Sequence, residues 1–201
     1  GSDFLERISV THFTAETLPQ YMAEKKTRQD EIKDVGGFVG GYVNNGRRKA
    51  ENITHRQMVT LDIDFAKSVA DIWELFTMLF ACSAALYSTH KHSPESPRLR
   101  LIIPLDRPVS TDEYVPIARR IAGELGINSF DDTTYEPSRL MYWPSTSKDA
   151  EYVFLHQDGP WLSADTVLAS YKNWQDASQW PVSDRIGEVI QRAITKQGDP
   201  L

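Results

Sequence analysis

The sequence predicts an α+β fold, and the order of its apolar patterns carries that prediction. Alternating or continuous apolar runs typical of strands occur at residues 58–65, 84–93, 98–105 and 139–144. Two segments with apolar residues at helical spacing stand between them, Ser68 to Ala85 and Ser110 to Leu125. Strand, helix, strand, strand, helix, strand is the split β-α-β order of an RRM/ferredoxin-like mixed sheet flanked by helices.

Composition limits the classes of protein that the chain can belong to. The 201 residues are 40% hydrophobic and 25% charged, which fits a globular domain with a core. The net charge of −6 argues against a protein that coats nucleic acid with its whole surface, although basic residues gather at 47–56 and 90–107. No run is long and apolar enough for a membrane span, and the single Cys82 permits no internal disulfide. We therefore expect a cytoplasmic location.

The N-terminal part carries few candidate functional groups. Residues 15–34 predict one polar surface helix with Thr14 as its N-cap and with little chemistry of its own. The glycines at 36–41 allow close backbone approach, and the Asn-Gly pair at 45–46 indicates a turn. The basic arm that follows, residues 47–49, is either a solvated loop or a phosphate-binding segment.

Two carboxylates two residues apart end the first apolar run. On a strand, Asp62 and Asp64 point the same way, while Leu61, Ile63 and Phe65 point into a core. Like charges this close repel unless a cation lies between them, and oxygen-only ligands suit Mg²⁺ or Mn²⁺. The spacing therefore indicates a metal site, with a polar strand end as the alternative.

A histidine-bearing strand and an arginine-bearing strand follow, joined by the loop at 94–97. Paired as a hairpin, they would bring His90, His92, Arg98 and Arg100 together on the outer face. A further acidic pair, Asp131 and Asp132, stands before the strand at 139–144 and is either a third carboxylate site or the start of a turn.

The C-terminal part reads as a strand and two helices. The strand is expected at 152–155, and the helices at 161–180 and 185–196. Because the last third is acidic and carries none of these motifs, we divide the chain into a catalytic domain at 1–160 and a small helical appendage or connector at 161–201.

Three motifs in order resemble those of the archaeo-eukaryotic primase (AEP) superfamily. They are hydrophobic-DxD at 61–64, SxH at 88–90 and hydrophobic-D at 130–131. The sequence is most similar to the primase-polymerase (PrimPol) domains of phage and plasmid replication proteins, which are often fused to a helicase. The resemblance covers about residues 36–147.

The resemblance implies a role for each group of residues. The carboxylates that would hold two Mg²⁺ or Mn²⁺ ions are Asp62, Asp64 and Asp131, with Asp132 as the competitor of Asp131. The residues expected at the nucleotide are Ser88, His90 or His92, Arg98, Arg100 and Arg139. The residues expected at nucleic acid are Arg47, Arg48, Lys49 and Arg56.

The function expected from these residues is template-dependent nucleotidyl transfer by a DNA primase or primase-polymerase. Its partners would be single-stranded DNA or primer-template, NTP or dNTP, and a helicase, in the bacterial host cytoplasm. Two alternatives remain. A replication-initiator nickase would need a metal-binding histidine pair and a nucleophilic tyrosine, for which Tyr171 is the helix-borne candidate. A non-enzymatic RRM-like module would need exposed aromatic residues on its central strands.

Overall fold

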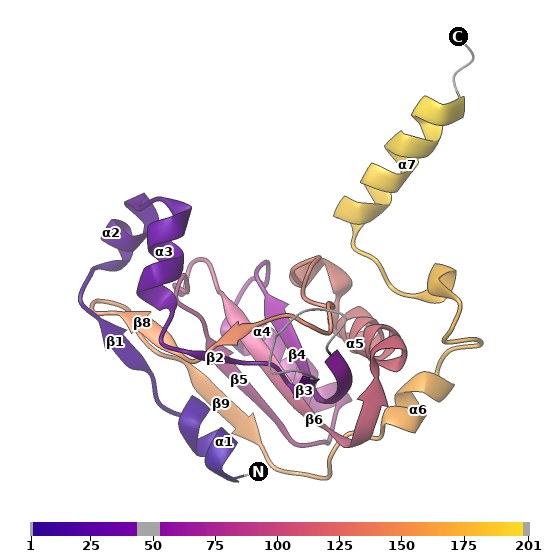
Figure 1. Cartoon of the computed structure of the whole chain (residues 1–201), viewed down its shortest axis with the longest axis horizontal. Coiled ribbons are helices and arrows are strands. Elements are labelled where there is room, and N and C mark those ends of the chain that lie inside the picture. The colour runs from indigo at the N-terminus through magenta and orange to yellow at the C-terminus, as the bar shows by residue number, and fades with distance from the viewer. Residues whose placement is uncertain (1, 44–52, 199–201) are drawn as a thin grey trace.

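A computed structural model describes residues 2–43 and 53–198 and shows an α+β fold (Figure 1). Its largest sheet has five strands in the order β3-β4-β6-β5-β9, and every neighbouring pair is antiparallel. Their bounds are β3 Gly41–Val43, β4 Ile53–Ile63, β6 Leu99–Ser110, β5 Ala84–Ser88 and β9 Phe154–Gln157. The predicted fold class is confirmed.

The split β-α-β order is present, except for its fourth strand. β6 lies between β4 and β5, as that arrangement requires. The fourth strand was expected at 139–144, but β7 (Met141–Tyr142) pairs with β2 (Gly37–Phe38) outside this sheet. At the free end of β4 only an isolated bridge joins Ile63 to Phe130. β3 pairs with the start of β4, residues 53–56, and a Cβ on Gly41 would meet the backbone oxygen of His55, so glycine permits this pairing.

Helices α4 (Val69–Leu79) and α5 (Thr111–Leu125) cover one face of the sheet and form the main core with it. Ser68 caps α4, and Ser110 with Glu113 forms a capping box at α5. One predicted core residue is wrong. Because β4 ends at Ile63, Phe65 turns outward, is 54% exposed, and lies 4.1 Å beneath the guanidinium of Arg185.

The other face of the sheet is covered by α1 (Ser2–Ile8) and by the β2-β7 pair. Buried residues of the sheet and of α1 meet aromatic side chains there: Ala85, Tyr87 and Ile102 of the sheet and Ile8 of α1 pack against Phe4, Phe38 and Trp143. The aromatic rings of Phe4, Phe38 and Trp143 contact one another. This face is therefore a second, smaller core in which these rings are partly buried, and Phe4 and Phe38 also line an apolar pocket of about 500 Å³.

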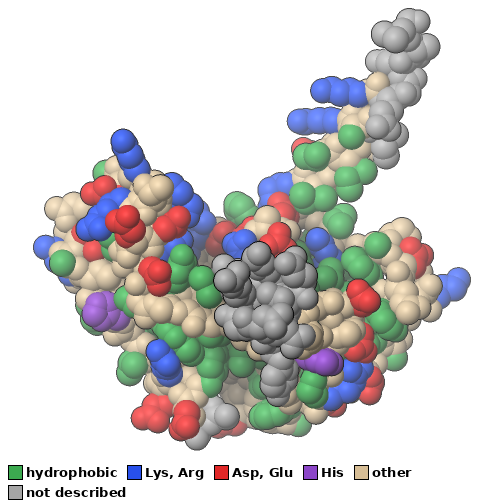
Figure 2. Space-filling model, viewed as in Figure 1, with side chains coloured by type: hydrophobic (Ala, Val, Ile, Leu, Met, Phe, Trp, Pro, Cys, Tyr) green, Lys and Arg blue, Asp and Glu red, His purple; other side chains and the backbone are tan. Residues whose placement is uncertain are grey.

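The segment at 15–34 is two helices, where the sequence predicted one. α2 (Leu18–Ala23) starts at Thr17, whose side chain forms a capping box with Gln20, and α3 (Lys26–Lys33) follows after an extended Lys25. Strand β1 (His12–Thr14) pairs in parallel with β8 (Ser145–Ser147). That pairing holds α2 and α3 at one end of the molecule (Figure 1), where acidic and basic side chains are mixed on the surface (Figure 2).

The C-terminal part has less helix than predicted. The helix expected at 161–180 is only α6 (Ala164–Ala169), because side chains of Asn173 and Asp176 bond to nearby backbone amides and favour turns. Helix α7 (Asp184–Gly198) agrees with the prediction and extends away from the body (Figure 1). Three residues of α6 belong to the main core, so the packing continues across residue 160: they are Ala164, Val167 and Leu168. No described helix is long and apolar enough to cross a membrane.

Candidate active site

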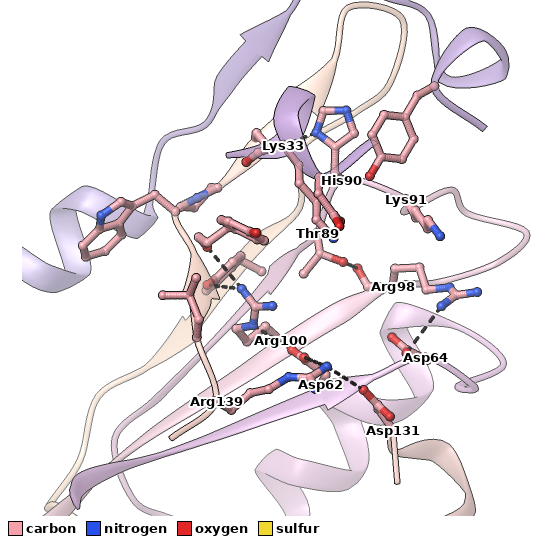
Figure 3. Close-up of a pocket in the computed structure, with 18 of the residues that line it drawn as sticks. Lys33, Asp62, Asp64, Thr89, His90, Lys91, Arg98, Arg100, Asp131 and Arg139 are labelled. Atoms are coloured by element: carbon pink, nitrogen blue, oxygen red, sulfur yellow. Dashed lines mark hydrogen bonds and ion pairs between the residues drawn. The ribbon is translucent and has the colours of Figure 1, made fainter. Parts of the chain in front are cut away.

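A polar pocket of about 470 Å³ lies beside the end of β4 and the start of β6. Five carboxylates line it, and three of them, Asp62, Asp64 and Asp131, come from the predicted motifs, while Asp30 and Glu136 do not. The backbone brings those three together, because the Asp131 amide donates to the Asp62 carbonyl over 3.0 Å and the Asp64 amide donates to Ser129 over 3.1 Å. The sequence predicted this grouping, and Figure 3 shows the three side chains at one end of the pocket.

Asp62 is paired with a buried arginine from the neighbouring strand. Its Oδ1 accepts a hydrogen bond of 2.7 Å from Nε of Arg100, directly opposite in the ladder. Arg100 also donates to the Tyr87 hydroxyl at 3.1 Å and to the Tyr142 carbonyl at 3.2 Å. Burial alone would lower the pKa of Arg100, but Asp62 and Tyr87 raise it above its ordinary value. Arg100 is therefore a fixed cation in the floor of the pocket.

The other two carboxylates are paired with more accessible arginines. Arg98 lies 3.4 Å from Asp64, and Arg139 lies 3.1 Å from Asp131 and 4.0 Å from Asp62. The side chains of Arg98 and Arg139 are each 33% exposed, so they can exchange partners more easily than Arg100. Burial, and then the charge of Asp62, raise the pKa of Asp64.

The carboxylate oxygens of Asp62, Asp64 and Asp131 are ligands of the kind that a divalent cation prefers. The three residues share a partly buried pocket. Burial is the main cause of the raised pKa of Asp64, and the charges of Asp62 and Asp131, which a cation would neutralise, raise it further. Their geometry is not that of a ready coordination sphere: within residues 2–43 and 53–198, no three His, Cys, Asp or Glu side chains are grouped to hold a metal ion. Arginines compensate these carboxylates in this conformation.

His90 lines the same pocket, but both of its ring nitrogens are engaged. Nε2 lies 2.8 Å from Oε1 of Glu16, and Nδ1 lies 2.8 Å from Oγ of Ser145. Ser147 also approaches Nε2, at 3.2 Å. Burial lowers the pKa of His90, although Glu16 opposes this. In this conformation His90 ties α2 and β8 to the hairpin, and it presents no free ring nitrogen to a ligand.

Two other residues expected at the nucleotide have structural contacts and do not line the pocket. His92 is buried, and its Nδ1 accepts a hydrogen bond of 3.0 Å from the amide of Arg98. Ser88 is 1% exposed, and its hydroxyl accepts a hydrogen bond of 2.8 Å from the amide of Val153. Between His90 and His92, only His90 lies at the pocket.

Two further expectations need correction. Asp132 accepts hydrogen bonds from Ser183 at 2.6 Å and from Arg185 at 3.1 Å, and it does not line the pocket. Arg56 was expected at nucleic acid, but it is fully buried, and its guanidinium lies 4.2 Å over the Tyr114 ring. Its hydrogen bonds go to the carbonyls of Gly40, Met58 and Pro137 and to the Thr60 hydroxyl. Arg47, Arg48 and Lys49 lie outside the described residues.

The N-terminal helices α2 and α3 contribute side chains to the pocket that the sequence did not predict. Tyr21 from α2, together with Lys26, Asp30 and Lys33 from α3, lines the pocket, and Glu16 holds His90. The only local signal is Tyr21, an isolated aromatic residue in a polar segment. No motif marks these residues, because they reach the pocket through the pairing of β1 with β8.

Comparisons with known proteins agree with this fold. The family model described as the VapE N-terminal domain matches residues 1–183. Among solved structures, the chain is similar to the AEP domain of the primase-polymerase of cyanophage S-2L, with a TM-score of 0.50 and 15% identity over 73% of this chain and 76% of that one. A search of curated proteins found no match. The resemblance to AEP primase-polymerase domains is thus confirmed in the fold.

Proposed function

Because this chain belongs to the family of VapE N-terminal domains and has the fold of a primase-polymerase domain, we propose that it is a template-dependent nucleotidyltransferase that makes or extends primers in phage or plasmid replication. The observation that carries the proposal is a single pocket in which Asp62, Asp64 and Asp131 lie beside Arg98, Arg100 and Arg139. Carboxylates next to cations suit a reaction between a hydroxyl and a triphosphate.

Asp62, Asp64 and Asp131 would hold Mg²⁺ or Mn²⁺, as two ions. Such ions neutralise charge on the attacking and leaving oxygens of a phosphoryl transfer. Arg98 and Arg139, which are partly exposed, would leave their carboxylates and bind the triphosphate of NTP or dNTP. Arg100 would stay with Asp62 and keep that carboxylate oriented.

The partners follow from this reaction. They would be a single-stranded DNA template or a primer-template, and a fused or associated helicase that supplies single strands. The other two candidate functions lose their support. Tyr171, the tyrosine considered for a nickase, donates to the Pro116 carbonyl at 2.6 Å and is buried. The aromatic residues Phe4, Phe38 and Trp143 pack together in the second core, which disfavours an open RNA-recognition surface.

Primer extension and de novo synthesis on single-stranded DNA test the proposal, with NTPs or dNTPs and with Mg²⁺ or Mn²⁺. Asp64→Asn should abolish incorporation. Asp132→Asn is the matched control, because it removes a carboxylate of the same region that bonds to Ser183 and Arg185 outside the pocket. Equal activity of both variants and the wild type would refute the assignment of the pocket, and absence of incorporation by the wild type under all four conditions would refute the reaction.

A further inference from the structure

Tyr21 is an exception among the buried tyrosines. The residue is fully buried, yet its hydroxyl has no hydrogen-bond partner among residues 2–43 and 53–198. By contrast, the hydroxyl of Tyr87 accepts from Arg100, and that of Tyr171 donates to the Pro116 carbonyl. A buried hydroxyl without a partner destabilises the fold, and a ligand that accepts its hydrogen bond would remove this cost.

The unpaired hydroxyl belongs to a residue that lines the polar pocket. The ring of Tyr21 packs against the ring of His90, with 4.3 Å between their centroids. Because Glu16 and Ser145 occupy both nitrogens of His90, Tyr21 is the side chain of this pair that can still donate to a ligand. Burial, followed by the charges of Asp30 and Glu16, raises the pKa of Tyr21 to about 12, so the hydroxyl keeps its proton at neutral pH.

The charges at this end of the pocket favour an anion. Lys26, Lys33 and Lys91 line it together with one carboxylate, Asp30. Asp30 already pairs with Lys26 at 2.5 Å and with Lys33 at 3.3 Å. Burial lowers the pKa of Lys33, and so do the charges of Lys26 and Lys91, which a bound anion would offset. Figure 3 shows Lys33, His90 and Lys91 grouped apart from Asp62 and Asp131.

We propose that the Tyr21 hydroxyl donates a hydrogen bond to a phosphate oxygen of a nucleoside triphosphate whose tail lies among Lys26, Lys33 and Lys91. The inference rests on the proposed function and names the part of its substrate that this end of the pocket binds. It makes α2 and α3 a phosphate-binding element of the site. Tyr21 thus contacts the triphosphate directly, while His90 supports the tyrosine ring.

Tyr21→Phe tests this, since it removes only the hydroxyl. Binding of inorganic triphosphate, ATP and dATP is measured by calorimetry without template, together with the melting temperature of the free protein. We expect about tenfold weaker binding of all three probes, as for a lost hydrogen bond to a charged group. The melting temperature of the free protein should stay equal or rise, because the variant no longer buries an unpaired hydroxyl.

Tyr171→Phe is the matched control. It removes a buried tyrosine hydroxyl that has a partner outside the pocket, so it should lower the melting temperature and leave the affinity for triphosphate unchanged. Unchanged triphosphate affinity in Tyr21→Phe would overturn the inference. Weaker binding of ATP and dATP with normal binding of inorganic triphosphate would also overturn it, because the hydroxyl would then contact sugar or base.

The binding experiment separates this inference from the proposed function. A protein that binds triphosphate through Tyr21 but incorporates no nucleotide would refute the function and support the inference. If the wild type incorporates nucleotide and Tyr21→Phe binds triphosphate normally, the proposed function is supported and the inference about Tyr21 is refuted.

Discussion

Arg100 and Asp62 form the most enclosed arginine-carboxylate pair among the described residues, with side chains only 9% and 10% exposed. Asp62 therefore has two roles. It lines the pocket as a candidate metal ligand, and it neutralises a guanidinium that is almost fully buried. Asp64 lacks the second role, because its partner Arg98 is 33% exposed. The two carboxylates of one motif should thus respond differently to substitution.

Asp62→Ala should destabilise the protein by about 3–5 kcal/mol, because it leaves Arg100 as an unpaired buried charge. Chemical denaturation measures this free energy of unfolding. The double variant with Arg100→Met should recover much of the loss, since both charges are then absent. A stable Asp62→Ala protein would contradict the role of the pair.

Asp64→Asn should leave the free energy of unfolding unchanged or slightly increased while it abolishes incorporation. Asp64 is partly buried near two other carboxylates, and neutralising it relieves that repulsion. Thermal melting of the variants Asp64→Asn and Asp62→Ala measures this difference in stability. If Asp64→Asn were the less stable of the two, the electrostatic argument would fail.

Arg56→Met should destabilise the fold by about 3 kcal/mol without a selective effect on DNA affinity. The guanidinium satisfies the carbonyls of Gly40, Met58 and Pro137, which the variant leaves without this donor. Denaturation and DNA-binding titrations measure the two effects. Arg98→Met is the comparison, because it removes a partly exposed arginine and should lower nucleotide affinity with little change in stability. A stable Arg56→Met protein with weaker DNA binding would restore the original assignment of Arg56.

Acidification should destabilise the protein partly through His92. Burial lowers the pKa of His92 in the folded protein below the ordinary 6.5. The stability that the neutral ring contributes is therefore present above pH 6.5 and is lost as the pH falls toward the pKa of the folded state. Protonation of Nδ1 also breaks the hydrogen bond from the Arg98 amide. His92→Asn keeps an acceptor but cannot titrate. Its denaturation midpoint should therefore fall less than that of the wild type between pH 7.5 and 5.5, and an equal fall would contradict this.

Removing residues 187–201 should leave both melting temperature and primer extension unchanged. Val189 and Ile190 on α7 are 61% and 49% exposed, and the contacts of Ser183 and Arg185 with Asp132 are retained. Thermal melting, primer extension and de novo synthesis with the shortened protein check this. Loss of de novo priming with extension retained would instead assign α7 a role in initiation.

Local patterns predicted the central part of the fold well. Alternating or continuous apolar runs identified β4, β5 and β6, and helical spacing identified α4 and α5, because each pattern reflects the burial of a single element. The carboxylates Asp62, Asp64 and Asp131 were found for the same reason, since they sit at the ends of such elements.

Other contacts depend on tertiary structure and leave no local pattern. Arg56 reads as a solvent-exposed basic residue, and only the carbonyls around it explain its burial. Tyr21 and Glu16 reach the pocket across long stretches of chain, so spacing cannot indicate them. Asp131 bonds to Arg139 and lines the pocket, whereas Arg185 and Ser183, which come from a distant part of the chain, bond to Asp132 outside it.

The pairing of β1 with β8 has a consequence for the order in which the protein folds. It joins His12 to Ser145, whereas β5 and β6 are separated only by the loop at residues 89–98. Closing a long loop costs more chain entropy and slows the formation of the contact. The hairpin should therefore form early, and α2 and α3 should dock late. In hydrogen exchange, amides of β1 and β8 should be among the first to open, while those of β4 and β6 stay protected until the whole domain unfolds.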